Sequence, residues 1–172
     1  PVGGALDEDC LFLNIYLPNS RGKSRPVLIW FHGGGFVAGS ANEYDGSVLA
    51  EQGDVVVVLV NSRLGPFGFF DWSYFGADYE GSASNGIRDQ ILALRWVREN
   101  IEDYGGDPGN VTIFGQSSGA SSVLALLAAP AADGLFHKAI SCSGTAVYRP
   151  SEDQTEKLAR RLSIQQDDLL EE

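Results

Sequence analysis

Residues 110–123 read NVTIFGQSSGASSV, and this stretch holds the pattern that decides the fold. Val111–Phe114 is a short run of β-branched and apolar residues, which predicts a strand. Ser118–Ala129 is rich in small and apolar residues and is stopped by Pro130, which predicts a helix. A strand that runs directly into a helix is typical of α/β proteins with a parallel sheet.

The turn between these two elements, Gly115-Gln116-Ser117-Ser118-Gly119, matches the G-x-S-x-G pattern of a nucleophile elbow. In that turn the serine sits on a strained backbone, and the two glycines allow the strand and the helix to approach closely. Ser117 is therefore the candidate catalytic nucleophile. The alternative interpretation is an ordinary glycine-rich turn between a strand and a helix.

A second glycine-rich motif follows another predicted strand. Pro26–His32 is a nearly continuous apolar run, and His32-Gly33-Gly34-Gly35-Phe36 breaks it. Backbone N–H groups in such a loop can donate to an oxyanion, and glycine leaves room for the substrate. The alternative is a flexible loop tip. Acyl transfer requires both a nucleophile and oxyanion donors, so the two motifs together predict that chemistry.

The rest of the chain continues the alternation of strands and helices. Further strands are predicted at Cys10–Leu17, Val55–Val60 and Ala139–Cys142, and helices at Gly46–Gln52 and Ile87–Ile101. Asp107-Pro108-Gly109-Asn110 predicts a turn, and Ser151 with Gln154 predicts the start of another helix. The fold class is therefore α/β, with helices covering a parallel sheet.

Composition excludes several classes of partner. The net charge of −11 disfavours binding to nucleic acid and to anionic membranes. The longest apolar run, Val123–Ala132, is about half of the ~20 residues that a membrane span needs. No spacing typical of a metal site or a phosphate loop is present, so no cofactor is expected.

Several stretches closely resemble the type-B carboxylesterase and cholinesterase family, which includes bacterial para-nitrobenzyl-type esterases. The matching stretches are 8–14, 26–40, 63–69, 85–90, 105–108, 110–123 and 135–141. The resemblance implies an incomplete α/β-hydrolase fold and a small-molecule carboxylic ester as substrate. It assigns Ser117 as the acylated nucleophile, and the N–H groups of Gly34, Gly35 and Ser118 as the oxyanion hole.

Three positions depart from the family pattern. Gln116 stands where the family usually has glutamate, Ser118 where it usually has alanine, and Cys142 where glutamine is frequent. The neutral Gln116 is expected to weaken any preference for cationic substrates. Ser118 keeps its backbone N–H, so the oxyanion hole is expected to survive.

The general base is the missing part of the mechanism. The usual chain order in this fold is serine, then acid, then histidine. The chain has two histidines: His32 belongs to the oxyanion loop, and His137 follows Ser117 by too short an interval. We therefore expect the triad acid and histidine to lie outside this chain, and the 172-residue chain to be inactive alone. The chain also lacks Met, so we expect it to be part of a longer protein.

The expected organisation is a core portion at residues 1–148, with the oxyanion loop and the elbow, and the start of a helical segment at 149–172. Two other functions remain open. One is a non-catalytic, cholinesterase-like domain for binding or adhesion, and the other is a fragment without independent function. Ser117 argues against the first, because non-catalytic relatives typically lose the serine.

Four further features have competing interpretations. Arg63 and Asp89 are expected to form a structural ion pair. Cys10 is either half of a disulfide with an upstream cysteine, as the resemblance suggests, or a buried free thiol. Asn110 begins a glycosylation sequon that we attribute to chance. The aromatic residues at 72–75 line a route to the serine or simply pack together.

Overall fold

The computed structural model describes residues 7–20, 24–146 and 160. Its strands are β1 (Leu13–Tyr16), β2 (Arg25–Phe31), β3 (Val56–Val60), β4 (Gly106–Gln116) and β5 (Lys138–Cys142). Its α-helices are α1 (Ser47–Gly53), α2 (Gly65–Phe69), α3 (Asn85–Asn100) and α4 (Ser118–Leu127). Short 3-10 helices are η1 (Ala41–Glu43), η2 (Ser73–Phe75), η3 (Ala77–Tyr79), η4 (Ser82–Ser84), η5 (Ile101–Tyr104) and η6 (Pro130–Ala132).

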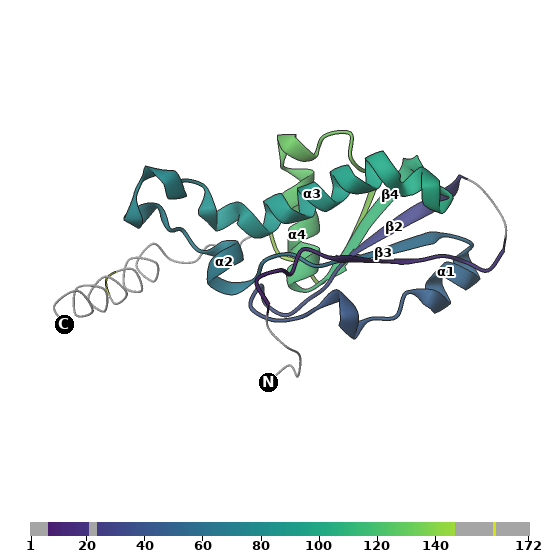
Figure 1. Cartoon of the computed structure of the whole chain (residues 1–172), viewed down its shortest axis with the longest axis horizontal. Coiled ribbons are helices and arrows are strands. Elements are labelled where there is room, and N and C mark those ends of the chain that lie inside the picture. Colours follow the sequence, from purple (N-terminus) through teal and green to yellow (C-terminus); the bar gives the residue numbers. More distant parts are fainter. Residues whose placement is uncertain (1–6, 21–23, 147–159, 161–172) are drawn as a thin grey trace.

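The strands form one sheet in the order β1-β3-β2-β4-β5. β1 is antiparallel to β3, and the other neighbouring pairs are parallel. Helices α3 and α4 lie over one face of the sheet, and α1 lies on the other side (Figure 1). The predicted α/β class with a mostly parallel sheet is therefore confirmed.

The core explains the two kinds of strand pattern. β3 is buried along its whole length, as its continuous valine-rich run predicts, because both of its faces are covered. In β2 fully buried side chains alternate with half-buried ones. Val27, Ile29 and Phe31 point under α3 and α4, whereas Leu28 and Trp30 face the smaller cluster beside α1.

One prediction about β4 was wrong. Asp107-Pro108-Gly109-Asn110 is part of this strand and not a separate turn. The register advances from Arg25↔Gly106 to Val27↔Val111, so residues 107–110 form a wide bulge opposite Pro26. Pro26 has no N–H to donate. Within the bulge the Gly109 N–H donates to Asp107 Oδ1 at 2.8 Å, a hydrogen bond between residues two apart that is typical of turns.

Two segments differ from the expected outline. Helix α2 was not predicted, because its sequence, GPFGF, is short and rich in glycine. The segment between α2 and α3, which carries η2, η3 and η4, projects away from the sheet (Figure 1). The helix predicted to start near Ser151 and the division at residue 149 lie outside the described residues, Arg160 excepted.

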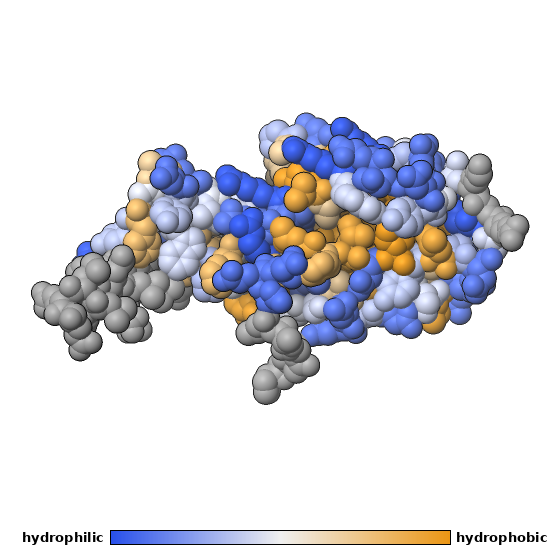
Figure 2. Space-filling model, in the orientation of Figure 1, coloured by the Kyte–Doolittle hydropathy of each residue, from blue (hydrophilic) through white to orange (hydrophobic). Residues whose placement is uncertain are grey.

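Apolar surface remains uncovered in the described part of the chain. A band of hydrophobic residues crosses one face between α3 and α1 (Figure 2). All five residues of the edge strand β5 are exposed, including Ile140, which is 51% exposed. Within the described residues, no helix is long and apolar enough to cross a membrane.

Candidate active site

Ser117 occupies a sharp turn between β4 and α4. Its backbone has φ 55° and ψ −123°, a region that non-glycine residues rarely adopt. Its N–H donates to the Cys142 carbonyl at 3.0 Å, and its own carbonyl accepts from the Ser121 N–H at 3.0 Å. Backbone bonds on both sides thus hold the strained turn, as a nucleophile elbow requires.

The two glycines of the motif are required by contact. A Cβ on Gly115 would lie 2.5 Å from the backbone carbon of Gly119. A Cβ on Gly119 would lie 2.0 Å from the carbonyl oxygen of Phe31, in the neighbouring strand β2. Helix α4 can therefore approach the sheet closely only because these positions lack side chains.

The glycine-rich loop after β2 begins beside the serine. A Cβ on Gly33 would lie 2.8 Å from Gln116 Oε1 and 3.4 Å from Ser117 Cβ. The loop then turns at Gly34, with φ 115°, and Gly35, with φ 64°, and both residues are exposed. The structure thus brings the start of this loop and the elbow together, because both follow the carboxyl ends of neighbouring parallel strands.

Three backbone N–H groups, two in the glycine-rich loop and one at the start of α4, have no acceptor within the described residues. Those of Gly34 and Gly35 donate to no protein group there. Ser118 is the first residue of α4, where an N–H has no partner inside the helix. The positive end of the α4 dipole also lies at this point. Free N–H donors at a helix N-terminus suit a negatively charged oxygen, and a glycine-rich loop that begins beside the serine can supply more of them.

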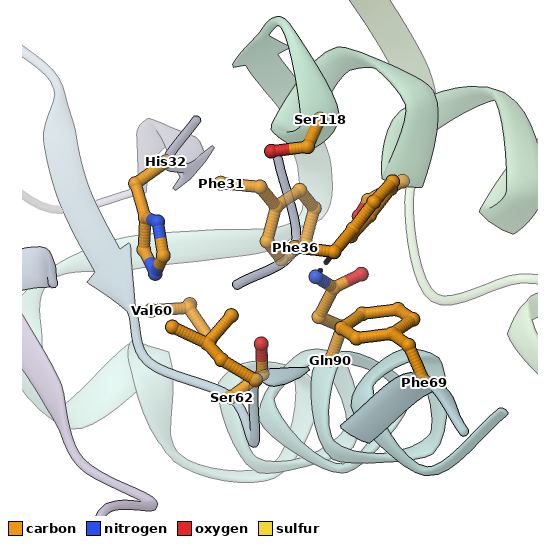
Figure 3. Close-up of a pocket in the computed structure, with 10 residues that line it drawn as sticks. Phe31, His32, Phe36, Val60, Ser62, Phe69, Gln90 and Ser118 are labelled. Carbon is orange, nitrogen blue, oxygen red and sulfur yellow. Dashed lines mark hydrogen bonds between the residues drawn. The ribbon is translucent and has the colours of Figure 1, made fainter. Parts of the chain in front are cut away.

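A small cavity is bordered by His32 and Phe36, at the two ends of the glycine-rich motif (Figure 3). Its volume is about 10 Å³, and its walls come from β2, the end of β3, α2, α3 and α4. Gln90 in its wall donates from Nε2 to Ser122 Oγ at 3.1 Å. Sequence reasoning gave no role to Gln90, Ser122 or Ser62. Gln90 and Ser122 lie in stretches that match the family, but those stretches do not indicate how the side chains pack, and Ser62 lies in no such stretch.

Neither histidine is placed to activate Ser117. His137 precedes β5, and its Nδ1 accepts from the Val111 N–H at 3.1 Å. Ser117 lies further along β4 than Val111, by about 20 Å at the ~3.3 Å rise of a strand residue. The Nδ1 of His32 lies 2.7 Å from the Gly33 carbonyl oxygen, and no hydrogen bond joins this ring to Ser117 in the described part.

The predicted ion pair between Arg63 and Asp89 is confirmed. Arg63 donates to the carboxylate from Nε at 2.8 Å, from Nη2 at 2.7 Å and from its backbone N–H at 3.0 Å. The pair joins the segment after β3 to α3 and raises the pKa of Arg63. Because the pair connects two elements and Asp89 is buried, we assign it a structural role.

Cys10 lies close to this pair. It is a half-buried free thiol, and burial together with the negative charge of Asp89 raises its pKa. Cys142, at the end of β5, is also free and is exposed. A disulfide from Cys10 to an upstream residue stays a prediction.

The aromatic residues after α2 contact one another. Trp72 packs against Phe70 and Phe75, with ring centroids 5.4 and 5.8 Å apart, and Tyr74 packs edge-on to Phe75. The Trp72 indole N–H donates to the Pro66 carbonyl at 2.8 Å. These contacts favour packing as the role of the cluster.

Across the described residues, no group of three or more histidine, cysteine or acidic side chains is arranged to hold a metal ion.

Comparison with known proteins gives the family. The family model described as "Carboxylesterase family" matches residues 2–169. The chain belongs to the carboxylesterase family. The resemblance inferred from the sequence is therefore confirmed.

Individual members of the carboxylesterase family are closely similar to the chain. Para-nitrobenzyl esterase of Bacillus subtilis (strain 168) is 50% identical over 159 residues, which cover 91% of this chain and 32% of the relative. The medium-chain fatty acyl-CoA hydrolase precursor of Anas platyrhynchos is 49% identical over 160 residues, which cover 92% of this chain and 28% of the relative.

The solved structures agree. A PNB esterase structure superposes with a TM-score of 0.84 at 48% identity, covering 93% of this chain and 34% of that chain. The fold is therefore that of this α/β-hydrolase family, as the sequence predicts. The chain spans about a third of the length of these relatives.

Proposed function

We propose that the protein containing this chain is a serine carboxylesterase, with Ser117 as its nucleophile. The observation that carries the proposal is the backbone of Ser117, at φ 55° and ψ −123°, between β4 and the N-terminus of α4 and next to the start of the glycine-rich loop. The sharp turn between a strand and a helix exposes the serine hydroxyl. Such backbone strain costs stability and is concentrated at active sites, so it favours a functional role for Ser117. Relatives named as esterases and carboxylesterases support the same activity.

In the proposed reaction, Ser117 Oγ attacks the carbonyl carbon of an ester. The carbonyl oxygen becomes an oxyanion, which accepts hydrogen bonds from the N–H groups of Gly34, Gly35 and Ser118. Each such donor contributes about 3 kcal/mol of transition-state stabilisation. Loss of the alcohol leaves an acyl-serine, and water then releases the carboxylic acid.

A serine hydroxyl requires an adjacent base to act as a nucleophile at neutral pH. His32 and His137, the two histidines in the chain, are both engaged elsewhere. We therefore propose that the triad histidine and acid come from protein sequence beyond this chain. On that basis the 172-residue chain alone does not turn over esters.

Gln116 supports a preference for uncharged esters. It precedes the serine directly, is exposed, and its Oε1 lies beside Gly33. A carboxylate at this point would attract a cationic substrate, whereas the neutral amide gives no such attraction. Replacement of Gln116 by Glu is therefore expected to improve kcat/KM for a cationic ester relative to a neutral ester of equal size.

The test is labelling of the complete protein with a fluorophosphonate, with Ser117→Ala as the control. Labelling that depends on Ser117 supports the proposal. Absence of labelling, with normal folding, favours the alternative of a non-catalytic binding or adhesion domain. The chain alone is assayed with a short-acyl nitrophenyl ester, and turnover abolished by Ser117→Ala would show that it needs no external base.

A further inference from the structure

The glycine-rich motif ends at Phe36, which has a strained backbone. Its φ of 63° lies in the left-handed region, which a bulky side chain rarely adopts and which glycine adopts without cost. Phe36 directly follows Gly35, one of the proposed oxyanion donors. Strain of this kind persists only where neighbouring contacts hold it, and it is concentrated at functional sites. The contacts of Phe36 therefore indicate what holds this end of the loop.

Helix α2 holds Phe36 with residues from both of its ends. The N–H of Gly65, the first residue of α2, donates to the Phe36 carbonyl at 2.6 Å. The ring of Phe69, the last residue of α2, packs against the Phe36 ring with centroids 4.5 Å apart and an angle of 47° between the planes. Both rings border the same cavity (Figure 3). One short helix thus contacts both the backbone and the side chain of Phe36.

Helix α2 is itself fixed to the neighbouring helix α3. A Cβ on Gly86, in the first turn of α3, would lie 2.3 Å from Phe69 Cζ, so the ring packs directly on the α3 backbone. A Cβ on Gly68 would lie 2.1 Å from the Arg63 carbonyl oxygen, so α2 packs equally closely on the segment before it. The pair between Arg63 and Asp89 joins that segment to α3. Phe69 therefore connects the glycine-rich loop to a closely packed part of the fold.

The proposed donors of the loop lie between this contact and the start of the loop. Gly34 and Gly35 are exposed, and neither has a side chain that would fix it in place. The N–H groups of Val37 and Ala38 both donate to the Gly34 carbonyl at 3.1 Å, which closes a turn that contains Phe36. A displacement of the Phe36 ring therefore moves this turn and the two donors within it.

We propose that Phe69 is a positioning residue for the oxyanion hole. Through the Phe36 ring it holds the N–H groups of Gly34 and Gly35 where the oxyanion forms. A displacement of about 1 Å can lower a catalytic rate about 100-fold, so loss of this ring contact is sufficient to affect turnover. The role rests on the proposed function, because it requires that these N–H groups bind an oxyanion.

The neighbouring residue Phe70 provides a matched control. It is half-buried, like Phe69, and its ring packs against Trp72 with centroids 5.4 Å apart. In the part of the chain that the structure describes, no ring contact joins Phe70 to Phe36. Phe70→Leu therefore removes a packed aromatic ring from the same segment and leaves the contact with the loop intact.

The kinetic test uses the complete protein and a short-acyl nitrophenyl ester. Phe69→Leu should lower kcat by about tenfold or more and change KM by less than about twofold, because oxyanion donors act mainly in the transition state. Phe70→Leu should change kcat by less than about twofold. An unchanged kcat in folded Phe69→Leu, or an equal loss in Phe70→Leu, would overturn the proposal.

A second variant removes the same contact from the side of the loop. Phe36→Leu should lower kcat as Phe69→Leu does, and it provides the test if Phe69→Leu does not fold. The double variant should lose no more activity than the more affected single variant, because both changes break one contact. Losses that multiply in the double variant would show that the two rings act independently and would overturn the proposal.

Hydrogen exchange gives a readout that needs no ester turnover. The amides of Val37 and Ala38 report on the closed turn, since both donate to Gly34. Their exchange should be faster by about tenfold in Phe69→Leu and unchanged in Phe70→Leu. Unchanged exchange in Phe69→Leu would overturn the positioning role. A complete protein that no fluorophosphonate labels would instead refute the proposed function on which the role rests.

Discussion

The pair between Arg63 and Asp89 allows a prediction whose size follows from the structure. Replacing Arg63 by Ala removes two charge-assisted hydrogen bonds to a carboxylate that is only 4% exposed. Such bonds contribute about 1.5–3 kcal/mol each, and breaking a buried pair costs about 3–5 kcal/mol. Because the Arg63 side chain is 39% exposed, solvent screens part of the attraction. We therefore expect a loss near the lower limit, about 3 kcal/mol.

The assay is urea unfolding followed by circular dichroism, with free energies extrapolated to water. Arg95→Ala is the control, since this arginine is exposed on α3, and it should change stability by no more than about 0.5 kcal/mol. The exchange Arg63→Asp with Asp89→Arg should recover part of the loss of either single reversal. It should not recover all of it, because the Arg63 backbone N–H also donates to Asp89. A loss below about 1 kcal/mol for Arg63→Ala, or no recovery in the exchange, would refute the reasoning.

Three further predictions follow from single contacts. Gly119→Ala should lower stability by about 3 kcal/mol in thermal unfolding, because its Cβ would lie 2.0 Å from the Phe31 carbonyl oxygen; a smaller loss would mean that α4 can shift. Ser117→Gly should raise the unfolding free energy by about 1 kcal/mol, because glycine accepts this backbone conformation; destabilisation would show that the turn stores no strain. The Arg25 guanidinium lowers the pKa of Asp54, so this pair stabilises the fold above about pH 4 and loses that effect as the pH falls through the lowered pKa. Asp54→Asn should therefore differ from the native chain at neutral pH and converge with it in acid, and an equal difference at every pH would exclude the linkage.

The sequence predicted the sheet because its strands carry strong, regular patterns. The run at Val55–Val60 is apolar throughout, and β3 is buried on both faces. Helix α3 likewise follows its spacing of apolar residues. Two local features were not predicted correctly. Helix α2 depends on tertiary packing more than on propensity, and the bulge in β4 combines turn residues with a place in the ladder.

The site was predictable where a motif fixes the backbone, and hidden where it depends on side-chain packing. Ser117 and the glycine loop lie in short patterns that follow neighbouring strands, so their proximity follows from the sheet topology. Ser62 lies in no such pattern, and the stretch 85–90 that contains Gln90 does not indicate where its side chain packs. Their place in the cavity wall results from the way α3 and the end of β3 pack against α4, which no short window of sequence encodes.

The hydrogen bond from the Ser117 N–H to the Cys142 carbonyl has a consequence for dynamics. It ties the candidate nucleophile to β5, an edge strand whose residues are all exposed. Fraying of that strand would release the amide of Ser117 to solvent. Hydrogen exchange at this one amide therefore measures how firmly the sheet edge is closed, and any partner that docks on β5 should slow the exchange.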